Sequence, residues 1–363
     1  MIDIYGIEKC KNIAIEDLIS ACMKWHFSEE TGSEFWLNKK RGLNFDPIKD
    51  IKTLKDLALF EDYVDEMRTV NANALIPKGI RKLGHNIRIY ESGGTTGSPQ
   101  RIVDSYSRQE ALGWVEEHLE KFGISKDLKG DWIHIGPSGP HIVGTSIGRL
   151  ANRRGKLCYY IDFDPRWVKY IAQIGKRELV KDYVNHILMQ TRHIMETQNI
   201  SVMLVTPLVL EAIVKDDGLM KRVQEKVKCI IWAGTSLDEE TLHVYQTYLF
   251  KEKIIMGIYG NTLMGISPQR PFQEIDTQLC VFQSYYPYSV VEIVKEDQKD
   301  TLVDYNTKGQ VCVTLMTPDV FIPKHLERDE AYRIVPVEGY IGDGVAQIGP
   351  LSKYKGTIFE GVY

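Results

Sequence analysis

The stretch Glu91-Ser92-Gly93-Gly94-Thr95-Thr96-Gly97-Ser98-Pro99 is the starting point for predicting how this chain folds. Residues 87–90 before it alternate apolar and polar side chains, which predicts a strand. Three glycines, four hydroxyl side chains and a proline in nine positions predict a loop rather than a core element. Backbone N–H groups of such a loop can surround phosphate oxygens, and the hydroxyls add further donors. An ordinary surface turn is the alternative, and composition alone does not decide between them.

Size and composition narrow the protein class. At 363 residues, the chain can bury a large core and is long enough for two or three domain-sized units. A net charge of -4 gives no basic excess, so nucleic acid is not an expected partner. No apolar run approaches the roughly 18 residues of a membrane span, and the start of the chain does not resemble a signal peptide. The six dispersed cysteines predict reduced thiols, a cytoplasmic location and no metal site.

Short apolar runs then alternate with segments of helical periodicity. We expect strands at residues 132–135, 157–161, 201–205, 228–232 and 254–258. We expect helices after Ser107, from about 167 to 197, and after Thr206, an N-cap followed by Pro207 at the first helical position. A further helix is expected after Ser236, where Ser236 and Glu239 form a capping-box pair. This alternation predicts an α/β sheet with substantial parallel pairing. Ligands of such sheets bind outside the carboxyl ends of the strands, where this chain places its Gly, Ser and Thr clusters.

The two ends of the chain follow other patterns. Residues 1–80 are mostly helical in pattern, and we assign them to the N-terminal part of the main domain. Residues 81–280 form the predicted α/β core. Within residues 281–363, two antiparallel strands are expected at 289–294 and 310–315, joined by a charged turn, which predicts a smaller β subdomain.

Four motifs in a fixed order carry a resemblance to a known family. Residues 92–99, 233–237 and 259–262 resemble, in turn, the phosphate loop, the adenine-side segment and the Tyr-Gly-x-Thr-Glu motif of the adenylate-forming (ANL) superfamily. Gly342-Asp343 resembles the late Gly-Asp pair of that family. Residues 35–57 resemble its phenylacetate-CoA ligase branch, and residues 317–331 also resemble short phenazine-antibiotic-biosynthesis-like proteins.

The resemblance implies a fold and an activity. The fold would be that of the ANL N-terminal domain, with stacked mixed β-sheets flanked by helices and a smaller late β subdomain. The activity would be ATP- and Mg²⁺-dependent formation of an acyl adenylate from a small aryl or acyl carboxylic acid. The acyl group would pass to an amine, a thiol or a carrier protein. A homodimer fits the phenylacetate-CoA ligase branch.

The same resemblance implies roles for individual residues. The loop would hold the β- and γ-phosphates, Tyr259 would pack on the adenine, Thr262 would donate to the α-phosphate, and Asp343 would accept from the ribose. His141 would lie against the acyl group, near Gly234 and Gly257. The nucleotide-binding set comprises Ser92, Gly93, Gly94, Thr95, Thr96, Gly97, Gly234, Thr235, Ser236, Tyr259, Gly260, Asn261 and Asp343.

Three departures bear on the activity. Gln100 replaces the lysine of the phosphate loop, and Arg101 beside it is the candidate substitute. Leu263 replaces the motif glutamate, which helps to hold Mg²⁺, and leucine has no oxygen ligand to offer. The family's C-terminal domain, with its catalytic lysine, is expected to be absent, and Lys353 and Lys355 are the only lysines near the end.

These departures leave two alternatives to the adenylating enzyme open. One is an acyl-protein synthetase, resembling those of bacterial luminescence, that moves the acyl group onto its own Cys312 or Cys280. The other is a catalytically idle nucleotide- or acyl-binding partner protein.

Overall fold

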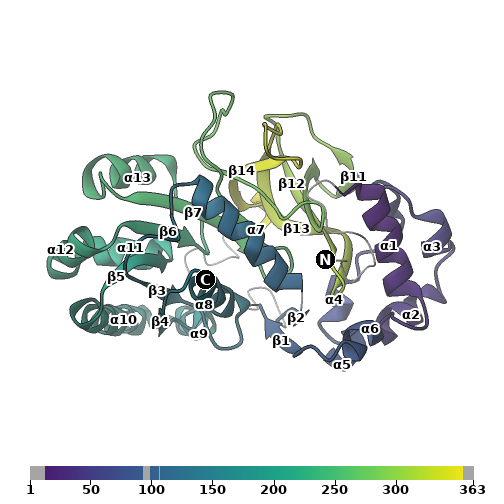
Figure 1. Cartoon of the computed structure of the whole chain (residues 1–363), viewed down its shortest axis with the longest axis horizontal. Helices are drawn as coiled ribbons and strands as arrows, with labels where there is room; N and C mark the ends of the chain where they lie inside the picture. Colours follow the sequence, from purple (N-terminus) through teal and green to yellow (C-terminus); the bar gives the residue numbers. More distant parts are fainter. Residues whose placement is uncertain (1–12, 93–98, 106, 355–363) are drawn as a thin grey trace.

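The computed structural model of this chain describes residues 13–92, 99–105 and 107–354. Within them, the chain forms two six-stranded sheets and a two-stranded sheet, with helices packed around them (Figure 1). The expected α/β class with stacked mixed sheets flanked by helices is confirmed.

The first sheet comes from the middle of the chain and has the strand order β4-β3-β5-β6-β7-β8. Strands β3 to β7 pair in parallel, and β8 pairs antiparallel with β7. Parallel strands covered on both faces consist of continuous apolar runs, and all six residues of β5 are buried. The strands are β3 (Asp131–Gly136), β4 (Cys158–Asp162), β5 (Ile200–Val205), β6 (Cys229–Ala233), β7 (Ile254–Asn261) and β8 (Gly265–Pro268).

Helices cover both faces of this sheet. On one face, α7 and α8 bury Leu112, Val115 and Leu150 against the strands. The helices of the opposite face bury Ile187, Val209 and similar side chains. These helices are α7 (Ser107–Lys121) and α8 (Ile142–Arg153) on the first face, and α9 (Pro165–Gln173), α10 (Arg177–Thr197), α11 (Pro207–Val214), α12 (Asp217–Lys226) and α13 (Glu239–Val244), continued by a π-helical turn at Tyr245–Leu249, on the second.

The second sheet is antiparallel throughout and has the order β11-β10-β12-β13-β14-β9. Its inward residues, such as Ile293 and Val313, belong to the same buried cluster as Trp232 of the first sheet, so the two sheets share a core. The strands are β9 (Val281–Phe282), β10 (Ser289–Lys295), β11 (Gln298–Leu302), β12 (Lys308–Met316), β13 (Phe321–Ile334) and β14 (Gly344–Pro350), with a 3-10 turn at Ser352–Tyr354.

The N-terminal helices pack against the second sheet, at the end of the molecule farthest from α10 and α12 (Figure 1). Phe27, Trp36 and Phe60 form an aromatic cluster with Phe321 of β13. These elements are α1 (Ile15–Phe27), α2 (Glu34–Lys40), α3 (Pro47–Asp50), a 3-10 turn at Asp56–Leu59, α4 (Val64–Met67), α5 (Ala72–Leu75) and α6 (Lys78–Lys82).

A short antiparallel hairpin holds the two ends of the Gly-rich loop. Strand β1 (Arg88–Glu91) pairs with β2 (Arg101–Asp104), and Ser92 N–H donates to the Gln100 carbonyl at 2.9 Å beyond the last pair. The Ser92 hydroxyl in turn accepts from Gln100 N–H at 2.9 Å. These hydrogen bonds fix the two ends of the Gly-rich loop, Ser92 and Gln100. Residues 93–98 of the loop lie outside the described residues.

Three local predictions are wrong. The helix expected from 167 to 197 is divided into α9 and α10, because Gly175 adopts a φ of 74°, a left-handed conformation that ends a helix. Helix α13 is capped by Asp238, whose carboxylate accepts from Thr241 N–H at 2.7 Å, and not by Ser236. The charged turn between β10 and β12 contains an extra strand, β11.

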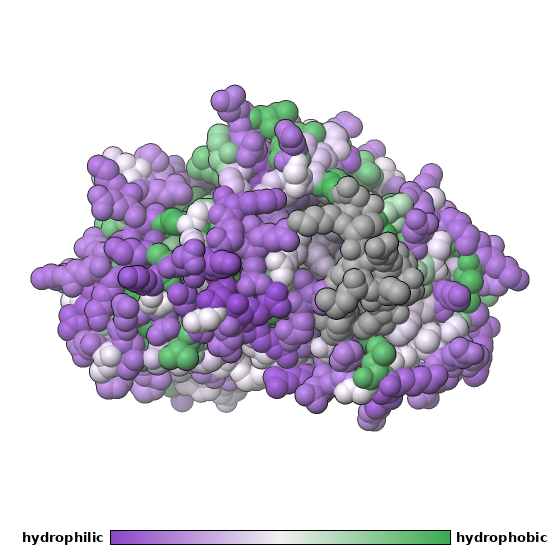
Figure 2. Space-filling view, in the orientation of Figure 1, coloured by the Kyte–Doolittle hydropathy of each residue, from purple (hydrophilic) through white to green (hydrophobic). Residues whose placement is uncertain are grey.

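In the described part of the chain, no helix is long and apolar enough to cross a bilayer. On the face shown in Figure 2, hydrophobic residues form small scattered groups among hydrophilic ones.

Candidate functional site

A cavity of about 660 Å³ lies at the carboxyl ends of β3, β5, β6 and β7, where the sequence predicts ligand binding. Its volume falls within the range of about 300 to 1,000 Å³ typical of small-molecule sites. Nine of the predicted site residues line it: Ser92, His141, Gly234, Thr235, Ser236, Tyr259, Gly260, Asn261 and Thr262. Gly93, Gly94, Thr95, Thr96 and Gly97 lie outside the described residues.

The segment after β6 enters the cavity as a sharp turn. Gly234 has a φ of 95°, a conformation that L side chains rarely adopt. Parallel neighbours β6 and β7 pair Ala233 with Ile258, so their carboxyl ends emerge together. This pairing brings residues 234–236 and Tyr259 to the same cavity although they are far apart in sequence.

The turn between β7 and β8 is tightly organised. A side chain at Gly260 would meet the Gly265 carbonyl at 2.1 Å, so this close approach requires glycine. Asn261 Oδ1 accepts from Leu263 N–H and Met264 N–H, both at 2.9 Å, and Asn261 Nδ2 donates to Glu327 Oε1 at 2.7 Å. The Asn261 amide is therefore engaged within the protein and holds the turn that begins at Thr262.

Two carboxylates from β13, missed in the sequence analysis, face this motif. Glu327 accepts from Asn261, and Asp329 Oδ2 accepts from the Tyr259 hydroxyl at 3.5 Å, a long contact. Both residues line the cavity. Burial, and then the negative charge of Glu327, raise the pKa of Asp329 to about 7. The sequence signal was the charged run Glu327-Arg328-Asp329-Glu330 inside a strand, which is unusual unless its side chains face water or a site.

Asp343 is placed differently from the ribose acceptor that the sequence predicts. It does not line the cavity. Its Oδ2 accepts from Arg333 Nε at 2.7 Å, and its Oδ1 accepts from the Tyr305 hydroxyl at 3.2 Å. The Arg333 guanidinium also lies over the Tyr305 ring, 4.1 Å from its centroid. The structure therefore gives Asp343 a structural ion pair and places Asp329, not Asp343, beside Tyr259.

His141 and Glu91 fix the base of the Gly-rich loop. His141 lines the cavity, and its Nδ1 lies 3.2 Å from the Glu91 carbonyl; because a carbonyl only accepts, this nitrogen carries the hydrogen. Burial, and then the nearby Arg166, lower the pKa of His141, which keeps it neutral near pH 7. A neutral ring with one engaged nitrogen can position the loop and contact an acyl group.

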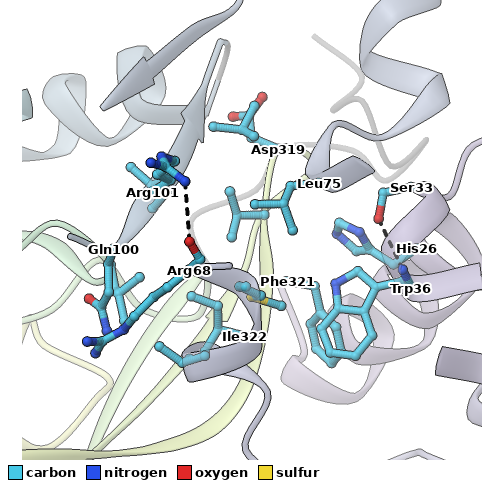
Figure 3. A pocket seen from close by; sticks show the side chains of 16 residues that line it. His26, Ser33, Trp36, Arg68, Leu75, Gln100, Arg101, Asp319, Phe321 and Ile322 are labelled. Carbon is cyan, nitrogen blue, oxygen red and sulfur yellow. Dashed lines mark hydrogen bonds between the residues drawn. The ribbon is translucent and has the colours of Figure 1, made fainter. Parts of the chain in front are cut away.

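Arg101 is held away from the large cavity. Its Nε donates to Glu91 Oε1 at 3.0 Å, and its Nη1 donates to the Arg68 carbonyl at 3.3 Å. Figure 3 shows Arg101 and Gln100 on one side of a second, small cavity of about 30 Å³, with His26 and Trp36 on the other. Glu91 also accepts from Arg166 Nη2 at 3.1 Å, so one carboxylate is shared by two arginines. Since Arg101 is paired with Glu91 and lines the small cavity and not the large one, its position does not favour a catalytic role.

Leu263 and the cysteines also have clear environments. Leu263 is 3% exposed and packs with Val64, Tyr90 and Ile142, so its side chain belongs to an apolar cluster. Burial raises the pKa of Cys312 and of Cys280 to about 12, although Cys280 lines the cavity. Both thiols are therefore protonated and poorly nucleophilic at neutral pH.

The residues around the cavity do not form a metal site of their own. No group of three or more His, Cys, Asp or Glu side chains suited to a metal ion occurs in residues 13–92, 99–105 and 107–354. Leu263, buried in its apolar cluster, offers no oxygen ligand to a metal ion.

Comparison with known proteins places the fold. No family model and no curated protein matches the chain. Among solved structures, an open conformation of 2-hydroxyisobutyryl-CoA ligase, in complex with 2-HIB-AMP and CoA, is similar with a TM-score of 0.63 and 11% identity over 93% of this chain and 68% of that one. The same ligase in the postadenylation state, with R3-HIB-AMP, gives a TM-score of 0.59 and 11% identity over 88% of this chain.

The chain therefore shares the fold of these two ligase structures, which is the fold that the sequence resemblance implied. The chain spans 62% and 68% of the length of these two ligase chains. At 11% identity the likeness establishes the architecture, and the chemistry has to be argued from the cavity.

Proposed function

We propose that this protein activates a small carboxylic acid with ATP, forming an acyl adenylate and releasing pyrophosphate. The observation that carries the proposal is the convergence of nine predicted site residues on one cavity. They come from four separate segments, after β1, after β3, after β6 and at the end of β7, which only this sheet topology brings together. Under a surface-turn interpretation, there would be no reason for them to share a cavity.

The reaction joins two anions. A carboxylate oxygen of the acid attacks the α-phosphorus, the new O–P bond forms, and the bond between the α-phosphorus and the bridging oxygen of the β-phosphate breaks. Pyrophosphate leaves with the electron pair, and no external oxidant or reductant is needed. The protein has to align the two anions and offset their charge, so positioning and electrostatic stabilisation dominate.

The cavity supports an assignment of its walls. The adenine lies between residues 234–236 and the Tyr259 ring, and Thr262 faces the α-phosphate. The ribose hydroxyls donate to Asp329, which takes the role first assigned to Asp343. Ser92 holds one end of the phosphate loop, and Mg²⁺ arrives bound to ATP.

The acid is of an aryl or medium-sized acyl type. Leu204, Trp232 and Ile258 give the cavity an apolar wall near Gly234. His141, neutral and partly engaged, closes the wall on the side of the loop. The acceptor of the acyl group is an amine, a thiol such as CoA, or a carrier protein, and a homodimer remains the expected assembly.

Carboxylate-dependent exchange of labelled pyrophosphate into ATP tests the proposal directly. We expect exchange with at least one member of a panel of aryl, amino and fatty acids, and none without acid. The test variant Thr262→Val, which replaces the hydroxyl with a methyl group, should reduce the exchange rate without unfolding the protein. ATP binding without exchange for any acid in a broad panel would contradict the enzymatic proposal.

That last outcome defines the second candidate, an idle nucleotide-binding protein. The specific observation in its favour is that neither Leu263, at the position of the motif glutamate, nor Arg101, the candidate substitute for the motif lysine, presents a charged group to the cavity. Leu263 is buried in an apolar cluster, and Arg101 is paired with Glu91. Calorimetry with ATP distinguishes this candidate from a protein that binds no nucleotide.

The third candidate, transfer to the protein's own cysteine, has little support in the thiol environments. Cys312 is fully buried, and the pKa of Cys280 is raised by burial. Intact-mass measurement after incubation with ATP and an accepted acid checks it, and an acyl adduct on Cys280 would revive it.

A further inference from the structure

Arg108 lines the candidate nucleotide cavity, although no sequence motif includes it. It lies in the first turn of α7, the helix that crosses the front of the molecule in Figure 1. Its Nη2 donates to the Thr262 carbonyl at 3.3 Å. A side chain at Gly265 would lie 2.6 Å from Arg108 Nη1, so this glycine leaves room for the guanidinium.

The charge of Arg108 is poorly compensated. The two carboxylates that act on it electrostatically are Asp104 and Asp319. Asp104 accepts from Arg149 at 3.0 Å, and Asp319 accepts from Ser107 N–H at 2.8 Å and from the Ser105 hydroxyl. Arg108 forms no ion pair with any residue in the described part of the chain.

A charged guanidinium that has few hydrogen-bond partners and no ion pair is unfavourable to withdraw from water. It has five N–H donors, and one hydrogen bond, to Thr262, engages it within the described residues. Burial lowers the pKa of Arg108, which means that its charged form is destabilised where it stands. An anion entering the cavity would offset this cost, so the site is prepared for a negatively charged ligand group.

The neighbours of Arg108 indicate which part of the ligand carries that charge. Tyr90 and Asp104, which act on it electrostatically, belong to the hairpin β1–β2 that holds the Gly-rich loop. The ends of that loop, Ser92 and Gln100, line the same cavity. The apolar side chains that line the cavity, such as Leu204, Trp232 and Ile258, belong to strands of the first sheet and not to this hairpin. The planar guanidinium fork matches phosphate oxygens.

We propose that Arg108 binds the triphosphate chain of the nucleotide and supplies the positive charge for which the sequence suggested Arg101. This inference rests on the proposed nucleotide site and adds a residue to it. Arg108 neutralises charge on the phosphates as pyrophosphate departs. It stays protonated, so it transfers no proton.

The test compares Arg108→Met and Arg108→Lys with the parent protein. Calorimetry measures the affinities for ATP, ADP, AMP and adenosine, and chemical unfolding measures the stability without ligand. The matched control is Arg153→Gln, which removes a cation that pairs with Glu116 on α7, away from the cavity.

We expect Arg108→Met to weaken ATP binding about 10- to 100-fold, because hydrogen bonds to charged groups are the strong ones. The loss should shrink with each phosphate removed and vanish for adenosine. Arg108→Lys should recover part of the affinity. Without ligand, Arg108→Met should be as stable as the parent or more so, since it removes a poorly compensated, half-buried cation. Arg153→Gln should bind all four ligands as the parent does.

Each other outcome overturns the inference. An equal loss for ATP and adenosine, together with lowered stability, would make Arg108 purely structural. Unchanged nucleotide affinity with a raised KM for the acid would move Arg108 to the carboxylate of the substrate. If the parent binds ATP and Arg108→Met binds it equally well, this inference alone fails. If the parent binds neither ATP nor adenosine, the proposed function fails as well.

Discussion

The replacement of Asp329 by Asn is the sharpest test of the nucleotide assignment. Asp329 lines the cavity beside Tyr259, whereas Asp343 is paired with Arg333 outside it. An ionised Asp329 accepts hydrogen bonds from ribose hydroxyls, and such charge-assisted bonds contribute about 1.5 to 3 kcal/mol. Asp329→Asn should therefore weaken ATP binding roughly 10- to 150-fold. Asp343→Asn, the matched control, should leave affinity near the parent value.

The raised pKa of Asp329 adds a dependence on pH, which the control Asp343→Asn should keep because it retains Asp329. With a pKa of about 7, Asp329 is half protonated at neutral pH, and a protonated carboxyl is the weaker acceptor. Nucleotide affinity should rise from pH 6 to pH 8 and then level off, with a change of up to about tenfold for each pH unit below the pKa. Asp329→Asn should abolish this part of the pH dependence, because the amide does not titrate.

The same shift predicts a change in stability. The pKa of Asp329 is raised in the folded state, so the unfolded chain loses its proton first as the pH rises from about 4 to about 7. Over that window, Asp329 lowers the free energy of unfolding, by at most about 4 kcal/mol and by less if solvent in the cavity screens the charge. Asp329→Asn should gain stability over the parent as the pH rises, and the gain should be largest above pH 7.

Calorimetry from pH 5.5 to 8.5 and urea unfolding over the same range measure both effects. A pH-independent affinity in the parent would refute the raised pKa as a feature of binding. A loss of affinity in Asp343→Asn with none in Asp329→Asn would return the ribose to the Gly-Asp pair and refute the placement argued here.

Three further predictions concern buried groups. Leu263→Glu should lower the free energy of unfolding in urea by several kcal/mol, because it places a charge in an apolar cluster. An unchanged urea midpoint of unfolding would mean that this side chain reaches solvent or phosphate. Burial lowers the pKa of His26 and of His134 to about 4, so the unfolded chain binds a proton at each histidine first as the pH falls below about 6.5. Each histidine should therefore lower the free energy of unfolding by about 3 kcal/mol between pH 6.5 and pH 4. A free energy of unfolding that stays constant over that window would contradict this. Cys312 should resist iodoacetamide at pH 7.5 in the folded protein and react after denaturation, as followed by mass spectrometry, and rapid native labelling would show that its burial is incomplete.

The features that were predicted best from the sequence are the strands of the parallel sheet and the gathering of polar clusters at one edge of it. Runs such as 201–205 are apolar because both faces of the strand are covered, and the clusters after them gather at one edge because parallel strands point the same way. Thr206 as the cap of α11, accepting from Val209 N–H, followed from local hydrogen-bonding chemistry. The cap of α13 went to Asp238 because the turn at Gly234 delays the start of the helix.

The antiparallel part was harder, since side-chain direction there depends on register. β13 is fourteen residues long and its pairing with β12 shifts register twice, so alternation along the sequence does not tell which of its charged residues faces the cavity. Asp343 looked like a site residue because of its two glycines. Its partner Arg333 lies on the neighbouring strand, where β13 and β14 pair Arg333 with Val345.

The two arginines show why proximity in sequence to the Gly-rich loop does not identify the cation that lines the cavity. Arg101 follows the Gly-rich loop directly, yet it is paired with Glu91, which lies opposite it in the β1–β2 register and also binds Arg166. Arg108 is farther along the chain, and the carboxylates near it are occupied by Arg149 and by the first N–H of α7. An arginine can bind an incoming anion when the carboxylates around it are already paired with other groups. This pairing depends on the three-dimensional structure and cannot be read from the sequence. A double replacement, Glu91→Gln with Arg108→Met, releases both Arg101 and Arg166 from their shared carboxylate and should therefore recover part of the lost ATP affinity. No recovery would contradict the view that the pairing of nearby carboxylates decides which cation is available.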